Sequence, residues 1–127
     1  RSALQLLFAG RSIDLGVTTD QVLSKVARFH RAQVTKALVV HKTGAFNTAC
    51  AGGIYTAAAK AGSAIVAAGQ SYANLTATNK IVDCTIAAVA GTDAVIDNPL
   101  YFALTTGNTG GTGTLVADVY VFGVIID

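Results

Sequence analysis

The chain has 127 residues, of which 52% are apolar and 13% are charged, and its formal net charge is +2. Soluble domains usually contain about 25% charged residues, so we expect much of this surface to be buried against copies of the chain or in a larger assembly. The length suits a single domain. The charges form no Lys/Arg run, and no apolar run is long enough to span a bilayer, which disfavours nucleic acid and membranes as partners.

The first 19 residues do not follow the regular alternation of the rest of the chain. They include "SALQLLFAG", which is apolar but too short to cross a bilayer. We therefore predict an N-terminal arm over residues 1–19, packed on another chain or along a sheet edge. Residues 20–127 are predicted to form a single β-sandwich domain.

From residue 20 onward, apolar and polar residues alternate with a period of two, which predicts β-strands. The first strand is expected near residues 22–26, and a clearer one at residues 33–41. The alternation of the clearer strand predicts one face made of Val34, Leu38 and Val40, interrupted by Lys36, with Gln33, Thr35, Val39 and His41 on the other.

The Ala-rich stretch "AGGIYTAAAKAGSAIVAAG" at residues 51–69 has two interpretations. Ala favours helices, but a helix confined to residues 56–61 would be too short to be stable alone. Glycines flank that segment, and Gly62 suits a left-handed turn. We therefore predict a β-hairpin with the Ala run at its tip.

The C-terminal half predicts three further strands. "KIVDCTIAAV" is expected to direct Val82, Cys84 and Ile86 inward, and "LYFALTT" follows a Gly/Asp/Asn/Pro loop. "GNTGGTG" is predicted as a hairpin tip before the longest strand, "TLVADVYVFGVIID". Because that strand is apolar on both faces apart from Asp118, we expect it to be central in its sheet or covered by a neighbouring subunit.

Together these segments predict an all-β fold of about seven or eight strands joined by short turns. Frequent turn signals and the lack of a long helical pattern favour an antiparallel β-sandwich or a jelly-roll-like barrel, with the N-terminal arm attached.

The sequence offers no convergent set of catalytic or metal-binding groups. His30 and His41 lie eleven residues apart, outside the usual metal-ligand spacings, and are predicted as polar edge or interface residues. Asp93 and Asp97 lie in a Gly/Pro loop, where Asp commonly forms turns. We therefore predict that the chain is not an enzyme and takes no cofactor and no metal ion.

The two cysteines occupy positions that suit a small apolar residue. This favours free, buried thiols at Cys50 and Cys84, although the two would pair if neighbouring strands brought them within reach.

Several segments of the chain resemble small virion proteins of tailed bacteriophages, known as capsid decoration or cement proteins. The segments are "GVTTDQVLSKVA", "VTKALVVH", "AGGIYTAAAKAGSAIVAAGQSYANLTATNKIVDCTIA", and finally "LYFALTT" followed later by "ADVYVFG". The resemblance spans residues 16–123, and its most specific parts are "GGIYTAAAKAGSAIV" and "ADVYVFG".

This resemblance implies a non-enzymatic protein of the outer capsid surface, made in the bacterial cytoplasm, that bridges subunits of the major capsid protein lattice. It also implies self-association, as a homotrimer first and a dimer second, without direct contact to nucleic acid. Contact with capsid or neighbouring subunits would come from apolar residues of the arm: Leu6, Leu7, Phe8, Ile13 and Leu15. Removal of residues 1–15 is then expected to leave a folded domain that binds the lattice more weakly.

Two alternatives remain open at the level of the sequence. The chain could be another virion component of the same architecture, such as a tail, collar or head-fibre protein. It could also be a glycan- or receptor-binding module, for which Tyr72, Tyr101 and Asn108 are candidate loop contacts.

Overall fold

The computed structural model describes residues 4–87, 95–96 and 99–126. In this part of the chain nine β-strands form and no helix does. The strands are β1 (Gln5–Asp14), β2 (Gln21–Lys25), β3 (Arg31–Gly44), β4 (Ala51–Ala57), β5 (Ala61–Val66), β6 (Ile81–Asp83), β7 (Val95–Ile96), β8 (Leu100–Thr106) and β9 (Leu115–Ile125). The prediction of an all-β fold is therefore confirmed.

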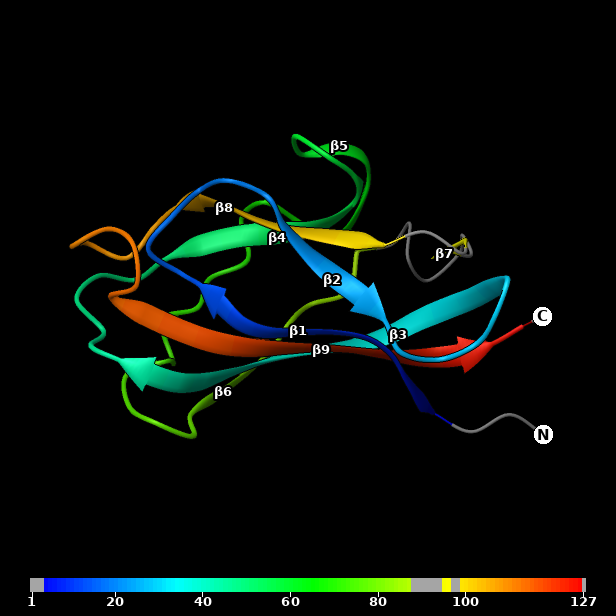
Figure 1. Cartoon of the computed structure of the whole chain (residues 1–127), viewed down its shortest axis with the longest axis horizontal. Helices are drawn as coiled ribbons and strands as arrows, with labels where there is room; N and C mark the ends of the chain where they lie inside the picture. Colours follow the sequence, from blue (N-terminus) through cyan, green and yellow to red (C-terminus); the bar gives the residue numbers. More distant parts are fainter. Residues whose placement is uncertain (1–3, 88–94, 97–98, 127) are drawn as a thin grey trace.

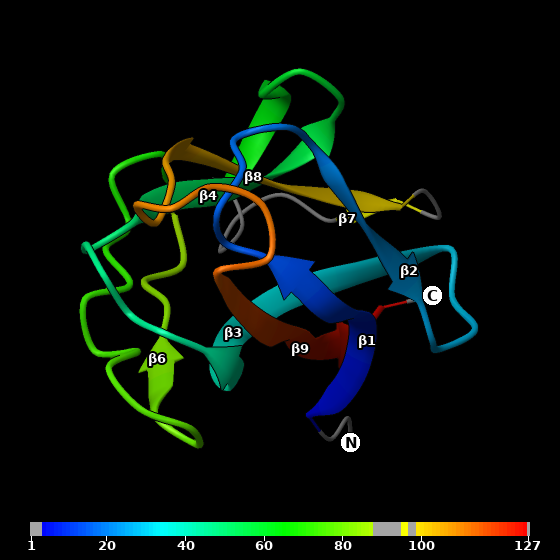
Figure 2. The ribbon, with the colours of Figure 1, turned by 60° about the vertical axis from the view of Figure 1, so that its left-hand side comes forward.

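The strands form one curled antiparallel sheet in the order β5-β4-β8-β2-β1-β9-β3-β6, with β7 also paired to β3. Figures 1 and 2 show that the half containing β4 and β8 lies across from the half containing β9 and β3. The halves meet where β1 pairs with β2, at Phe8–Lys25 and Ala9–Ser24. The result is the barrel-like, sandwich-like architecture that the sequence predicts.

The hydrophobic core lies between the two halves of the sheet. Its largest fully buried side chains come from most of the strands and from the loop after β5: Tyr72, Phe8, Phe102, Leu7, Leu15, Leu23, Ile54, Ile65, Leu75, Leu100, Leu104 and Leu115. Residues 81–87 span the open side of the curl, because the Cys84 N–H donates to Ala37 O at 2.9 Å and the Ala87 N–H donates to Ile65 O at 2.9 Å. This segment thus links β3 to β5.

The prediction of a separate N-terminal arm is wrong for residues 5–14. These residues form β1, which pairs with β2 on one side and with β9 on the other. The alternation is hard to recognise in the sequence because register shifts interrupt β1 between Leu6 and Phe8 and between Gly10 and Ile13. At such bulges the strand has an extra residue, and the period of two is lost.

A bulge in β3 also corrects the predicted faces of that strand. Val34 pairs with Gly123 and Lys36 pairs with the adjacent Phe122, so Thr35 is an extra residue. Beyond the bulge the inward positions become Ala37, Val39 and His41. Leu38 and Val40 therefore lie on the opposite face from Val34, contrary to the prediction.

The Ala-rich stretch forms the predicted hairpin of β4 and β5. The Ala61 N–H donates to Ala58 O across the tip, and Ala59 and Lys60 both have positive φ angles, of 62° and 58°. That geometry matches a two-residue type I′ turn. A carboxylate oxygen of Asp20 accepts a 2.6 Å hydrogen bond from the Ala59 N–H, which ties the tip to the β1–β2 loop.

The segment "GNTGGTG" is not a hairpin tip, because β8 and β9 are not neighbours in the sheet. It connects the two halves instead, and Asn108 anchors it. The side-chain oxygen of Asn108 accepts hydrogen bonds from the N–H groups of Asn47 and Thr48, at 2.8 and 3.1 Å. Its amide nitrogen donates to Ala45 O and to Thr114 Oγ1.

Candidate interaction surface

Of the five arm residues predicted to contact another protein, the structure leaves one accessible. Leu7, Phe8, Ile13 and Leu15 are buried in the core of their own domain. Only Leu6 points outward, opposite Phe122 of β9. The prediction that these five residues form an exposed contact arm is therefore wrong. Leu6, however, belongs to a larger exposed surface.

That surface is the outer face of the half-sheet β6-β3-β9-β1. Along β9, every second side chain from Leu115 to Gly123 is buried, and the residues between them are half-buried and point away from the core. The register places Leu6 and Lys36 beside Phe122, and Ala9 and Leu38 beside Tyr120. The outer face comprises Leu6, Ala9, Arg11, Asp14, Gln33, Lys36, Leu38, Val40, Lys42, Thr43, Ile81, Asp83, Val116, Asp118, Tyr120, Phe122 and Val124.

The apolar part of the outer face continues to the edges of the half-sheet. Ile81 on β6 is 47% exposed, and Leu4, one residue before β1, is 53% exposed. Between them lie the half-buried side chains of Leu38, Tyr120 and Phe122. Large apolar side chains that stay exposed or half-exposed on one face commonly mark a binding surface.

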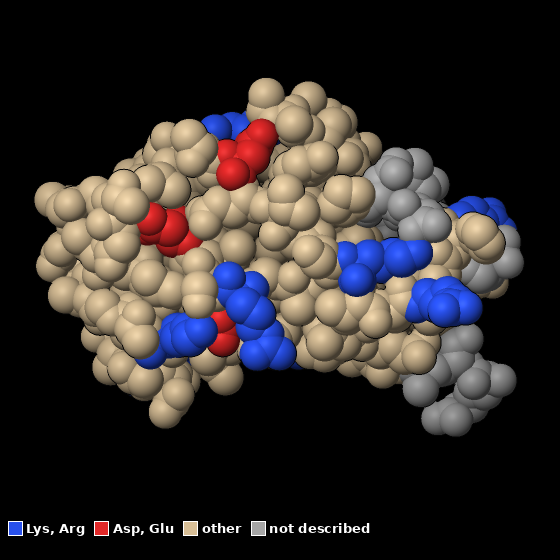
Figure 3. Space-filling view, viewed as in Figure 1, with Lys and Arg blue, Asp and Glu red and all other residues tan. Residues whose placement is uncertain are grey.

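The charged groups of the outer face are compensated within the chain. Lys36 Nζ lies 3.2 Å from a carboxylate oxygen of Asp83. The Arg11 guanidinium lies 5.7 Å from the centre of the Tyr120 ring, a cation–π arrangement. Figure 3 shows Lys and Arg side chains at several places on the side of the molecule where β1 and β9 are nearest the viewer, and fewer Asp side chains. The outer face thus combines large apolar side chains with three cationic and three anionic ones, whose charges balance.

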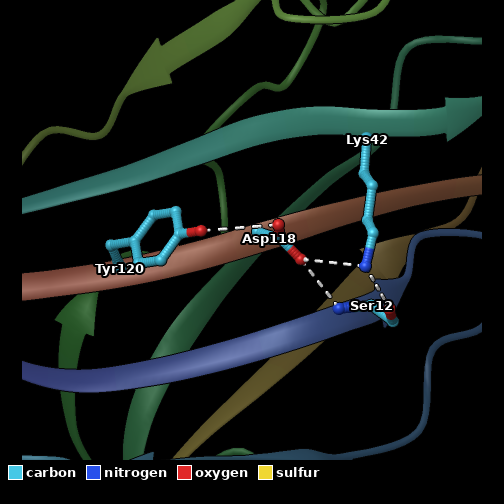
Figure 4. A network of polar contacts seen from close by, with 4 residues as sticks. All are labelled: Ser12, Lys42, Asp118 and Tyr120. Atoms are coloured by element: carbon cyan, nitrogen blue, oxygen red, sulfur yellow. Dashed lines mark hydrogen bonds and ion pairs between the residues drawn. The ribbon is translucent and has the colours of Figure 1, made fainter.

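A polar network centred on Asp118 fixes one end of the outer face (Figure 4). Asp118 Oδ1 accepts a 2.9 Å hydrogen bond from the Ser12 N–H and lies 3.9 Å from Lys42 Nζ. Lys42 Nζ donates to Ser12 Oγ at 2.8 Å, and the Tyr120 hydroxyl donates to Asp118 Oδ2 at 3.4 Å. Ser12 lies in the bulge of β1 between Gly10 and Ile13, and Lys42 lies in the bulge of β3 between His41 and Thr43. The Asp118 carboxylate therefore contacts a residue of each bulge.

We expect Asp118→Ala to lower the free energy of unfolding by about 1 kcal/mol, because a part-exposed N–H and an ammonium group lose their acceptor. Asp118→Asn keeps an acceptor for the Ser12 N–H and should lose less. Urea denaturation of the three proteins measures the difference. Equal stability of all three would show that the two bulges hold without the carboxylate.

The two cysteines and Tyr72 form a buried, unreactive cluster. Cys50 and Cys84 are free and buried, as the sequence favours. Burial raises the pKa of the Cys50 thiol, and burial also raises the pKa of the Cys84 thiol to about 11. Tyr72, whose pKa is likewise raised by burial, donates its hydroxyl to Gly52 O at 2.9 Å. Thiols with raised pKa values are poor nucleophiles at neutral pH.

His41 is also in the interior, so its predicted place at an edge or interface is wrong. The side chain is 2% exposed, and neither ring nitrogen has a hydrogen-bond partner among the described residues. The bulge at Thr35 turns this position inward. In the same part of the chain no three His, Cys, Asp or Glu side chains are placed to hold a metal ion. Asp93 and Asp97 lie outside the described residues.

The residues predicted as glycan contacts pack within the domain instead. Tyr72 and Asn108 are buried and hydrogen-bonded within the chain, and Tyr101 is half-buried on β8. A shallow, open depression is lined by small and polar residues near the loop after β5: Ala67, Gly69, Gln70, Ser71, Thr85 and Ala87. The Gln70 amide is engaged with Ser71 O and the Thr85 N–H, so it does not present a free polar site there.

One sequence signal did point to the outer face. The last strand is apolar on both sides, and the structure confirms that it is central, between β1 and β3. The residues of β1 and β3 that lie beside β9 on the outer face were not predicted, because the bulges in both strands decide which residues face outward.

Comparison of the chain with models of known protein families, with curated proteins and with solved structures gave no match. Within the described residues, no helix is long and apolar enough to cross a bilayer. The functional assignment therefore depends on the outer face and on the composition of the chain.

Proposed function

We propose that this chain is a non-enzymatic structural protein of a bacteriophage virion. In this role it decorates the outer surface of the capsid and stabilises the shell by bridging subunits of the major capsid protein. The observation that carries the proposal is the outer face, where half-buried apolar side chains lie among charged groups that balance one another. A chain with 13% charged residues and such a face is suited to assembly.

The fold suits a mechanical task that requires no chemistry. The 14 residues of β3 and the 11 residues of β9 pair along most of their length, and β9 pairs with β1 on its other side. A sheet of this kind resists deformation because its backbone hydrogen bonds must break together. A protein that bridges capsid subunits carries tension between its contacts, and weak contacts gain strength when several are made at once.

The proposed setting follows from the resemblance to decoration proteins of tailed phages. The chain is made in the bacterial cytoplasm and joins the shell from outside, with the major capsid protein lattice and further copies of itself as partners. No nucleic acid or membrane is part of this role. The test below distinguishes this role from two alternatives, namely a component of the tail, collar or head fibre and a glycan-binding module.

The test is the copy number of the protein in purified virions, measured by quantitative mass spectrometry against the major capsid protein. We expect a ratio near one or a simple fraction such as one third, because a decoration protein covers the whole shell. A handful of copies per particle would contradict decoration and favour a tail, collar or vertex component. Absence from particles would overturn the virion role and leave the glycan-binding module.

A second measurement tests the stabilising effect. Shells that lack the protein are incubated with the purified chain, and their disruption temperature is recorded. We expect the chain to bind and to raise that temperature. Binding without any rise would contradict the cementing role.

A further inference from the structure

We propose that the outer face of β6-β3-β9-β1 is the surface on which a second copy of this chain packs, forming a two-fold dimer. This proposal rests on the proposed function, because a protein that works in an assembly needs a surface for association. It goes further by naming the partner, a second copy, and the symmetry of the pair. A two-fold dimer also carries two copies of any surface that meets the shell, which is the simplest way for a small protein to bridge two capsid subunits.

The size of the outer face fits a stable interface between two proteins. At about 3.3 Å per residue, an 11-residue strand such as β9 is ~36 Å long. Strands lie about 4.8 Å apart, so the three long strands together with the short β6 cover roughly 500–700 Å² in projection. Specific interfaces bury about 600–1,000 Å² on each partner, and side chains that protrude add to the projected area.

The charge of the outer face favours a copy over a strongly charged partner. Three cationic and three anionic side chains lie on it: Arg11, Lys36, Lys42, Asp14, Asp83 and Asp118. Each has a partner in its own chain; Asp14, for example, accepts hydrogen bonds from the N–H groups of Gly16 and Gly113. A neutral face with compensated charges meets its own copy without like-charge repulsion, and it offers little to an acidic or basic ligand.

The arrangement of the apolar residues favours two-fold symmetry. Tyr120 and Phe122 lie near the middle of β9, which is itself the middle of the three long strands. Aromatic side chains at the centre of a face commonly dominate binding energy. One face that packs against itself makes a two-fold dimer, whereas a closed trimer needs two different complementary patches on each copy. We therefore expect a dimer rather than the homotrimer that the resemblance implies.

The experiment compares the oligomeric state of three versions of the full chain by sedimentation and light scattering over a range of concentrations. The unmodified chain should have twice its 12.9 kDa mass. Phe122→Asp places a carboxylate at the centre of the proposed interface, beside Lys36 of its own chain. Val22→Asp is the control, because Val22 is 53% exposed on β2, in the other half of the sheet.

We expect Phe122→Asp to weaken the dimer at least about 30-fold, as for a central interface residue, and Val22→Asp to remain dimeric. Circular dichroism and thermal unfolding check that each variant is folded, and the milder Phe122→Ser replaces Phe122→Asp if the latter unfolds. A monomeric or trimeric unmodified chain, or a folded Phe122 variant that stays dimeric, would overturn the proposal.

The outcomes separate this proposal from the proposed function. A chain that dimerises through Phe122 but is absent from virions supports the dimer and refutes the virion role. A chain that is abundant in virions but monomeric in solution supports the virion role and refutes the dimer.

Discussion

Deletion of residues 1–15 will prevent the chain from folding. The deletion removes β1 and the adjoining Leu15, and with them four core side chains, namely Leu7, Phe8, Ile13 and Leu15. Truncating one buried Leu, Ile or Phe side chain usually costs about 2–5 kcal/mol, so losing all four costs roughly 8 kcal/mol or more. Domains of this size have a total stability of about 5–15 kcal/mol. This expectation replaces the sequence-based one, in which the truncated chain keeps its fold.

Because of the position of β1 in the sheet, the deletion lowers the free energy of unfolding by more than the loss of the four side chains alone. β1 pairs with β2 and with β9, and it is the strand through which the two halves of the sheet are joined. Without it, the buried edge of β9 is left without hydrogen-bond partners, and β2 keeps only β8. Backbone groups that lose their partners in a buried place carry a further penalty.

Urea unfolding followed by circular dichroism, with amide dispersion in NMR spectra, measures the effect. The matched control is deletion of residues 1–4, which stops just before β1 and removes the exposed Leu4. The control should unfold cooperatively, close to the full chain. A cooperative transition in the chain that lacks residues 1–15 would mean that β1 is dispensable, as an arm would be.

The sequence predicted well the segments where the period of two holds, and also one hairpin that its turn residues mark. In β8 the predicted inner residues Leu100, Phe102 and Leu104 are buried, and the inner residues Val82 and Cys84 follow the expected pattern around β6. The hairpin of β4 and β5 was also predicted, because glycine positions argued against a helix. In these segments local propensity and burial agree, so the sequence alone is sufficient.

The errors occur where a strand contains a bulge. In β1, the register shift between Leu6 and Phe8 leaves the consecutive residues Leu7 and Phe8 both buried, so the alternation of the sequence is lost. In β3, one extra residue reverses the face of everything that follows, including His41. A bulge is selected by the neighbouring strands in the folded sheet, and no local pattern in this chain announces it. The outer face depends on the same bulges, so its membership could not be predicted either.

Gly123→Ala will lower the free energy of unfolding by about 3 kcal/mol, the upper part of the range for overpacking a core. A Cβ atom at this position would lie 2.0 Å from Gln33 O and 2.8 Å from Leu7 Cδ1. The Leu7 side chain can move, but Gln33 O belongs to the backbone of β3, so relief requires β3 and β9 to separate. The β3 bulge at Thr35 lies directly beside Gly123, and the β1 bulge at Leu7 lies beside the two residues before it, Val121 and Phe122.

The matched control is Gly69→Ala, the same change in a loop where no atom lies within 4 Å of the added Cβ. Its stability should stay within about 0.5 kcal/mol of the unmodified chain, and urea denaturation compares the three proteins. If Gly123→Ala is as stable as the control, β9 does not approach β3 as closely as described.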